Sequence, residues 1–413
     1  KSLEIRHCEI QGFLDMPDQM EHLKLILLYD NEIHAPLLLP QKLPEIRWIN
    51  IRYNDLKSLE GFPQKIESVE RLILSDNPIS DLSPIPSHLP NLDLLYMKGC
   101  DLQSLDSLRS EMPKLEELDL SDNQLTSLPD WVGNLTRLKK LKLEKNQFKK
   151  FPECLLNLDP GCEVTFKKNP VESRDTMEQF SRQQKREFIK DEREVEALIA
   201  LERQVDGFIH RDSYRANPGY DVEDGHVVWL GVDLRHGVDN VTEKIGEFTQ
   251  LSFLRMGGGK TLPGSIGNLK NLRVFKLTHG DQTELPARIG ELENLKKLKL
   301  RADLHSLPES IGKLKNLEVL DICWNKLTTL PESIGNLTQL RKLKAEENEF
   351  DGPPASIYPL KQLEVLRLGH IRNWYDQAVM ERVGNGTYHS RSKYLLRFLD
   401  YCEGLWKKRH HEK

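Results

Sequence analysis

The sequence predicts an α/β solenoid, in which short coils of chain stack into two curved arrays with parallel sheets on their concave sides. Three observations predict it: an apolar phrase that recurs every 23 residues in the first part, a related but looser phrase in the last part, and a charged stretch of helical pattern between them. A chain of 413 residues is also too long for one ordinary core, which favours a repeat array.

The first phrase is L-x-x-L-x-L-x-x-N, as in the segment from Leu115 to Asn123. Its alternating apolar residues predict a short strand with one face turned inward. The last position of the phrase is Asn or Cys in eight consecutive coils, always 23 residues apart: Cys8, Asn31, Asn54, Asn77, Cys100, Asn123, Asn146 and Asn169.

This recurring residue is predicted to form a ladder of hydrogen bonds inside the solenoid. The chain turns sharply after each strand and leaves backbone N–H and C=O groups buried, and an Asn amide can both donate to and accept from them. An unpaired buried group of this kind costs about 1–3 kcal/mol. Cys is small and a weak donor, so Cys8 and Cys100 are interpreted as ladder positions rather than as redox or metal-binding residues.

The second array repeats the phrase with looser spacing. The positions that correspond to the ladder lie at intervals of 24, 21, 23, 22, 23 and 23 residues, and only Asn325 and Asn348 among them are Asn: Arg235, Gly259, Gly280, Asp303, Asn325, Asn348 and Ile371. A second phrase, L-P-x-x-I-G, is clearer here and begins at Leu262, Leu285, Leu307 and Leu330. Its proline ends the strand side of each coil, and its isoleucine returns to the core.

These phrases resemble the LPxxIGxL repeats of cytoplasmic leucine-rich-repeat proteins of the Ras-suppressor and plant intracellular type. The resemblance implies two leucine-rich-repeat arrays and a role in binding. It leaves the partner open, because the family binds many unlike proteins. A small GTPase or its effector is one partner that the resemblance suggests, although no residue motif carries it over.

The domain boundaries follow from where the phrases begin and end. We expect a first array at 1–171, a helical cap and linker at 172–206, an N-terminal cap of the second array at 207–226, the second array at 227–375, and a C-terminal helical cap with a basic tail at 376–413. Two alternatives stay open for the middle of the chain: a continuous solenoid with degenerate repeats, or a coiled coil at 172–206 that binds a partner.

The concave face of the first array is predicted to carry exposed aromatic side chains. Tyr29, Trp48, Tyr53 and Tyr96 fall on or beside the outward positions of the strands, and clustered aromatic residues are typical of interface anchors. Acidic residues and then lysines follow along the same face, at Glu116, Glu117, Asp119 and Asp122 and then at Lys139, Lys140, Lys142 and Lys145. The alternative is that some of the aromatic residues pack against a cap or a neighbouring coil.

The concave face of the second array is predicted to carry a basic row. Its central outward position is basic in five coils, at Arg255, Lys276, Lys299, Lys344 and Arg367. If this row binds a partner, we expect an acidic protein segment or a phosphate-bearing ligand, with an affinity that falls as salt is added. The alternative is ordinary surface charge. The scarcity of interleaved aromatic residues argues against nucleic acid.

No motif predicts catalysis, a metal or a cofactor. Gly257 to Thr261 ends like a phosphate-binding loop, but the first glycine of that motif is replaced by Leu254, which falls on a strand of the second array. We therefore expect a non-catalytic scaffold or adaptor. The alternative is the substrate-recruiting region of a larger signalling enzyme or GTPase-linked protein, and a hydrolase with a site in the groove, or self-association, also stays open.

The remaining features favour a cytoplasmic address. The six cysteines are scattered and do not form the stapled caps of secreted repeat proteins, and the first residues do not resemble a signal peptide. No apolar run is long enough to predict a transmembrane helix.

Overall fold

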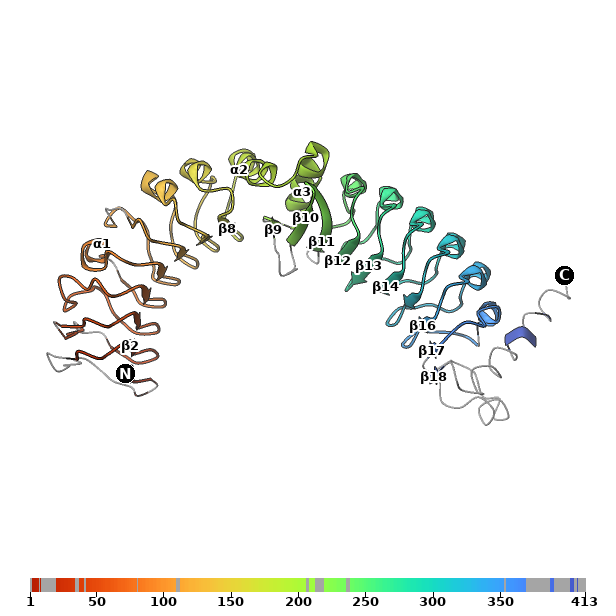
Figure 1. Cartoon of the computed structure of the whole chain (residues 1–413), viewed down its shortest axis with the longest axis horizontal. Helices are drawn as coiled ribbons and strands as arrows, with labels where there is room; N and C mark the ends of the chain where they lie inside the picture. The colour runs from red at the N-terminus through yellow and green to blue at the C-terminus, as the bar shows by residue number, and fades with distance from the viewer. Residues whose placement is uncertain are drawn as a thin grey trace. The chain divides into compact units, whose positions relative to one another are not determined.

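The computed structural model describes residues 2–6, 8, 20–33, 37–40, 42–79, 81–108, 112–205, 208–211, 219–234, 238–352, 354–368, 387–389, 402–404 and 407. The chain divides into two compact units, Lys1–Glu187 and Phe188–Lys413, so the boundary falls inside the segment predicted as helical cap and linker. In each unit a mainly parallel sheet lines one side, and short helical turns line the other (Figure 1). This is the α/β solenoid architecture that the repeats predict.

The first unit contains a parallel sheet of eight strands in chain order, counted over the described residues. The strands are β1 (Ser2–Glu4), β2 (Leu25–Leu27), β3 (Trp48–Asn50), β4 (Arg71–Ile73), β5 (Leu94–Tyr96), β6 (Glu117–Asp119), β7 (Lys140–Lys142) and β8 (Glu163–Thr165). Neighbouring strands pair residues that are 23 positions apart, as Ile26 pairs with Ile49. From β2 onward the middle residue of each strand is buried, and its two neighbours lie on the concave face, where all but Asn50 and Asp119 are at least partly exposed.

The ladder amides bond the coils to one another in the interior. Asn123 Oδ1 accepts from the N–H of Cys100 at 2.9 Å and of Leu102 at 3.1 Å, one coil earlier. Its Nδ2 donates to Met97 O at 2.8 Å and to Leu120 O at 3.0 Å. The same pattern recurs at the other ladder asparagines: Asn31, Asn54, Asn77, Asn146, Asn169, Asn325 and Asn348. Each coil is thereby tied to the one before it.

A cysteine at a ladder position lacks the side-chain oxygen with which Asn accepts from the preceding coil. Cys100 Sγ lies 3.4 Å from Leu74 O and 3.6 Å from Lys98 O, close to where Asn would place its donor. A thiol does not replace the amide oxygen, and the N–H of Ile79 donates instead to Asn77 O at 2.8 Å. Burial raises the pKa of Cys100 to about 12, as expected for an inert structural thiol.

At nine ladder positions the residue directly before adopts the left-handed conformation, with φ between 54° and 65°. This turn carries the chain off the sheet. Most residues found there are small or polar, but two are large aromatic residues: Asp30, Tyr53, Asp76, Gly99, Asp122, Lys145, Lys168, Trp324 and Glu347. A bulky side chain is disfavoured in this region of backbone space, so Tyr53 and Trp324 occupy strained positions.

Helical segments cover the opposite side of the first unit, and one of them closes its end. The segments are α1 (Pro84–His88), η1 (Asp130–Asn134), η2 (Glu153–Asn157) and α2 (Asp175–Arg186). Phe180 of α2 packs against Phe151, with the ring centroids 5.2 Å apart. Gln184 Nε2 donates to Cys162 O at 2.7 Å. The helix therefore covers the apolar edge of the last coil and pairs one of its carbonyls.

The second unit begins with a helix and a hairpin. Helix α3 (Glu192–Val205) packs against β11 (His226–Leu234), which pairs with β10 (Gly219–Glu223) in antiparallel register around a turn at Asp224 and Gly225, both with positive φ. Two buried carboxylates of α3 pair with backbone N–H groups, because Glu194 accepts from Val227 of β11 and Glu202 accepts from Ile209, directly before β9. These bonds anchor the helix to the first strands of the unit.

The second sheet has ten strands among the described residues. Besides β9 (His210–Arg211), β10 and β11 it contains β12 (Phe253–Gly258), β13 (Val274–Thr278), β14 (Lys297–Arg301), β15 (Val319–Asp321), β16 (Lys342–Lys344), β17 (Val365–Arg367) and β18 (Thr387–His389). The strands from β11 to β17 are parallel, and β18 pairs with β17 in antiparallel register. Strand β18 lies within 376–413, where the sequence predicts a helical cap, and most of that segment lies outside the described residues.

The L-P-x-x-I-G phrases form short 3-10 helices on the side opposite the sheet. They are η4 (Gly264–Asn268), η5 (Ala287–Glu291), η6 (Glu309–Lys313) and η7 (Glu332–Asn336), flanked by η3 (Glu243–Glu247) and η8 (Ala355–Ile357). The proline precedes the first residue of each of the four helices, and the isoleucine is fully buried. The glycine permits close stacking, since a Cβ at Gly312 would lie 2.4 Å from Ser333 O.

One predicted ladder position of the second array is wrong by one residue. Asp303 is exposed and pairs with Lys326, whereas the buried residue whose N–H donates to Asn325 Oδ1 is Ala302. Ala302 lies 23 residues before Asn325, which is the usual ladder spacing. The coil of β14 therefore has one residue fewer between its strand and its ladder position than the sequence pattern suggests. In the preceding coil Gln282, fully buried, donates to Gly258 O at 2.8 Å. Arg235 and Ile371 lie outside the described residues.

We expect Asn123→Ala to destabilise the first unit by about 3 kcal/mol, because it leaves buried N–H and C=O groups of two coils without partners. The free energy of unfolding in urea would measure this loss. Asn134→Ala is the control, since Asn134 is exposed and lies outside the ladder. Equal effects of the two substitutions would contradict the ladder as the source of stability.

We expect Gly312→Ala to destabilise the second unit by about 1–3 kcal/mol, because the new methyl group overlaps Ser333 O and the two coils must move apart. Thermal denaturation followed by circular dichroism would measure the change. At Gly264 a Cβ would meet only Arg288 Cδ, at 3.8 Å, so Gly264→Ala serves as the matched control and should be nearly neutral. A stable Gly312→Ala variant would show that the coils are not packed this closely.

Candidate functional site

The concave face of the first unit carries a half-buried apolar and aromatic surface over β2 to β5. One row of the sheet runs through Leu25, Trp48, Arg71 and Leu94, and the next runs through Leu27, Asn50, Ile73 and Tyr96. Trp48 and Tyr96 therefore lie on the same face, as predicted from the phrase, but β4 separates their strands. Tyr29 follows β2 and is half-buried.

Arginine and lysine side chains cover the faces of these aromatic rings. The guanidinium of Arg52 lies 5.0 Å from the ring centre of Tyr29 and 5.5 Å from that of Tyr53, and Arg71 lies 6.0 Å from Trp48. Lys142 lies 5.4 Å from Tyr96. The predicted aromatic patch thus consists of aromatic rings in contact with cations. Together with the neighbouring apolar residues we call it the aromatic–arginine surface: Leu25, Leu27, Tyr29, Trp48, Arg52, Tyr53, Arg71, Ile73, Leu94 and Tyr96.

The polar atoms of Trp48 and Tyr96 differ in whether they have a hydrogen-bond partner. Trp48 Nε1 is buried but meets no acceptor in the part of the chain that the structure describes. The Tyr96 hydroxyl donates to Glu117 Oε2 at 2.5 Å. Burial, followed by this bond to Glu117, raises the pKa of Tyr96 well above its ordinary value. The phenol is therefore held in place by the next coil, whereas the buried indole N–H has no partner among the described residues.

Tyr53 occupies a different place from the other three. It lies in the left-handed turn after β3, and half of its side chain (50%) is exposed. Trp324 occupies the equivalent turn of the second unit and is 60% exposed. These two are the exposed large hydrophobic residues of the described chain. The left-handed turn that carries Trp324 is visible in the backbone and not in the repeat phrase.

The acidic and basic stretches of the first unit neutralise each other. Lys139 pairs with Glu116 at 2.6 Å, Lys142 with Asp119 at 2.9 Å, and Lys145 with Asp122 at 3.0 Å. In each pair the carboxylate lies one coil, or 23 residues, before the lysine. The change of charge sign along this face therefore produces ion pairs between coils rather than two separate charged surfaces.

The basic row of the second unit is brought together by the register of the strands. Arg255, Lys276 and Lys299 lie opposite one another on β12, β13 and β14. Asp321 follows on β15 and separates them from Lys344 and Arg367. Lys299 lies 3.7 Å from Asp321, and Arg367 lies 3.8 Å from Glu346. The row therefore falls into a cationic group of three and a partly neutralised end.

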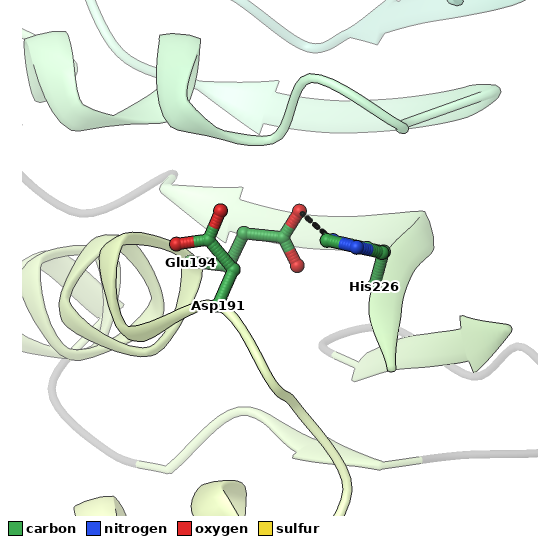
Figure 2. Close-up of side chains that lie close together, drawn as sticks. All are labelled: Asp191, Glu194 and His226. Atoms are coloured by element: carbon green, nitrogen blue, oxygen red, sulfur yellow. Dashed lines mark hydrogen bonds and ion pairs between the residues drawn. The ribbon is translucent and has the colours of Figure 1, made fainter. Parts of the chain in front are cut away.

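A cluster of carboxylates and a histidine lies at the start of α3, where Asp191, Glu194 and His226 bring one ligand atom each within 4.8 Å of the others. Figure 2 shows the Glu194 carboxylate pointing at the His226 ring, 3.3 Å from Nδ1. The chain already uses these oxygens: Glu194 accepts from the N–H of Val227, and Asp191 accepts from the N–H and the guanidinium of Arg193. The cluster caps the helix and attaches it to β11.

Gly257 and Gly258 are the last residues of β12, and Gly259 begins the turn after it. Gly258 and Gly259 have φ of 72° and 77°, and the N–H of Lys260 donates to Val238 O and Asp239 O. Lys260 itself pairs with Asp239 at 2.6 Å. The resemblance to a phosphate-binding loop is therefore explained by the geometry of the array.

Neither unit has a helix long and apolar enough to cross a membrane, within the residues described.

Comparisons with known proteins match each unit separately. The family described as leucine-rich repeat region matches residues 287–387, and the family of two-copy leucine-rich repeats matches residues 113–157. No curated protein gives a match. These matches support leucine-rich repeats and do not show the resemblance to Ras-suppressor-type proteins.

Several solved structures are similar to the chain in fold. A leucine-rich-repeat protein of Leptospira interrogans is 21% identical over 87% of this chain and 76% of its own, with a TM-score of 0.41. An internalin of Listeria monocytogenes is 19% identical over 82% and 86%, with a TM-score of 0.43. The plant peptide hormone receptor RGFR1, solved in complex with RGF2, is 18% identical over 90% and 70%, with a TM-score of 0.39. The leucine-rich-repeat assignment rests on the family models, each of which matches one stretch of a different unit.

Proposed function

We propose that the chain is a non-catalytic scaffold or adaptor that binds protein partners on the concave faces of its two arrays. The observation that carries the proposal is the aromatic–arginine surface, where Trp48 and Tyr96 on the sheet and Tyr53 in the turn after β3 each lie beside a cation. Tyr, Trp and Arg are the residues most enriched at the energetic centres of protein interfaces. A repeat scaffold holds them in fixed relation, so little ordering is needed on binding.

The chemistry of this surface describes the partner better than the family resemblance does. No described residue carries the resemblance to Ras-suppressor proteins over to a small GTPase. The surface offers apolar area and the cations Arg52 and Arg71. It fits a protein segment that combines apolar side chains with carboxylates, because the carboxylates pair with the arginines at the rim.

We place the protein in the cytoplasm. All six cysteines are free thiols, and five of them are buried. Burial raises the pKa of Cys162, Cys323 and Cys402 to about 12. Unpaired buried thiols are typical of proteins from reducing compartments.

We expect the double substitution Trp48→Ala and Tyr96→Ala to weaken partner binding by about thirtyfold or more, because truncation of a central aromatic anchor typically costs about 2 kcal/mol. The immobilised chain would be used to recover partners from a lysate for quantitative mass spectrometry. The affinity of a recovered partner would then be measured by calorimetry. Circular dichroism would verify that the variant is folded.

Trp131→Ala is the matched control, because Trp131 lies on η1, on the side opposite the sheet. It should leave binding unchanged. A partner that is retained by the concave-face variant but lost with Trp131→Ala would place the interface on the helical side and contradict the proposal.

A further inference from the structure

Lysines at equivalent strand positions have neighbours of opposite charge in the first unit and of like charge in the second. In the first unit Lys142 follows Asp119 in the neighbouring strand and pairs with it at 2.9 Å. In the second unit the neighbour of Lys276 on β12 is Arg255, and the neighbour of Lys299 on β13 is Lys276 itself. The second sheet therefore stacks like charges in three successive coils, where the first sheet stacks opposite charges.

These side chains form one compact cationic group. Neighbouring strands of a sheet lie about 4.8 Å apart, so Arg255, Lys276 and Lys299 rise from adjacent points on the concave face. Arg301 lies two residues beyond Lys299 on β14 and hence on the same face. We call Arg255, Lys276, Lys299 and Arg301 the basic cluster.

The charges of the basic cluster are poorly compensated within the chain. The one carboxylate that forms an ion pair with it, over the described residues, is Asp321, 3.7 Å from Lys299. Arg301 Nε is buried and meets no acceptor in the described ranges. Burial, and then the charges of Lys299, Arg255 and Lys297, lowers the pKa of Lys276 below its usual value. Folding thus brings cations together at a cost that an anionic ligand would remove.

We propose that the basic cluster binds a phosphorylated serine or threonine within an extended segment of a protein partner. A phosphate group carries close to two negative charges and three strong acceptor oxygens, so one group can serve several of these donors at once. Arginine matches it with paired N–H bonds, which Arg255 and Arg301 can supply. This inference rests on the proposed function and specifies the partner class for the second array.

The surroundings of the basic cluster favour a peptide over a nucleic acid. Phe253 borders the cluster, but the Lys276 ammonium lies 5.1 Å from its ring centre, and Trp229 stacks against it at 5.6 Å. The ring faces that nucleobases would stack on are therefore already occupied. An extended peptide places every second side chain on one face, about 6.8 Å apart. This spacing matches the distance between the row of Arg255, Lys276 and Lys299 and the position of Arg301, two residues further along the strand.

The test uses the full chain and a fluorescent peptide that carries two phosphoserines separated by one residue, followed by fluorescence anisotropy. We expect the phosphopeptide to bind at least about tenfold more tightly than the same peptide with serine or with glutamate at both positions, and its affinity to fall as salt is added. Equal affinity for the glutamate peptide, or tighter binding of a short single-stranded oligodeoxynucleotide, would overturn the proposal.

The variant Lys276→Gln with Lys299→Gln should remove this preference. The matched control is Lys296→Gln with Arg341→Gln, in the same unit, where the cations pair with Glu318 at 3.2 Å and Glu364 at 2.9 Å. The control should bind the phosphopeptide as the natural chain does. Thermal melting would verify that both variants are folded, and undiminished binding by the first variant would overturn the proposal.

Phosphatase treatment of the lysate separates this inference from the proposed function. We expect partners that require Lys276 and Lys299 to be lost after treatment. If partners that depend on Trp48 and Tyr96 are captured while the phosphopeptide fails to bind, this inference fails and the scaffold function stands. If the phosphopeptide binds and no partner depends on Trp48 or Tyr96, the phosphopeptide site stands and the proposed role of the first array fails.

Discussion

The pairing of backbone groups inside the coils is the constraint on which the rest of this structure depends. A solenoid with such short strands buries turns as well as strands, and a turn cannot satisfy its own N–H and C=O groups. The Asn side chain solves this once per coil: Asn146 accepts from Leu125 and donates to Leu120 and Leu143. Because the bond joins fixed positions of neighbouring coils, coil length is held at 23 residues throughout the first unit.

The same constraint leaves the concave face free to vary, and the two units use that freedom differently. Residues on either side of the buried middle residue do not contribute to the core. In the first unit they form aromatic–cation contacts and ion pairs between coils, such as Lys142 with Asp119. In the second unit they place Arg255, Lys276 and Lys299 in succession. Surface ion pairs contribute little to stability, so this difference points to binding rather than to folding.

The fold was predictable because its signal is carried by single residues at fixed spacing, as at Asn54 and Asn77. The basic row was predictable for the same reason. The prediction of Asp303 as a ladder position is wrong because its coil has one residue fewer after the strand. The repeat phrases of the neighbouring coils are unchanged, so the sequence pattern does not reveal the shortening. The covering of Trp48 by Arg71 and the cluster of Glu194 with His226 were beyond the sequence pattern. They depend on side-chain directions and on segments far apart in the chain, which no repeat period encodes.

The missing amide at Ala302 has a mechanical consequence. Asn325 and Asn348 bond their coils to the preceding ones through the side chain, but Ala302 has no polar side chain. Its link to the preceding coil relies on backbone bonds such as Gly280 N to Arg301 O at 3.3 Å. We therefore expect the seam between β13 and β14 to resist tension less than the seam between β15 and β16, which Asn348 bonds. Strands β13 and β14 carry Lys276 and Lys299. A dianion bridging the two lysines would span the seam between these strands, so occupancy of the basic cluster and the resistance of the array to stretching are coupled.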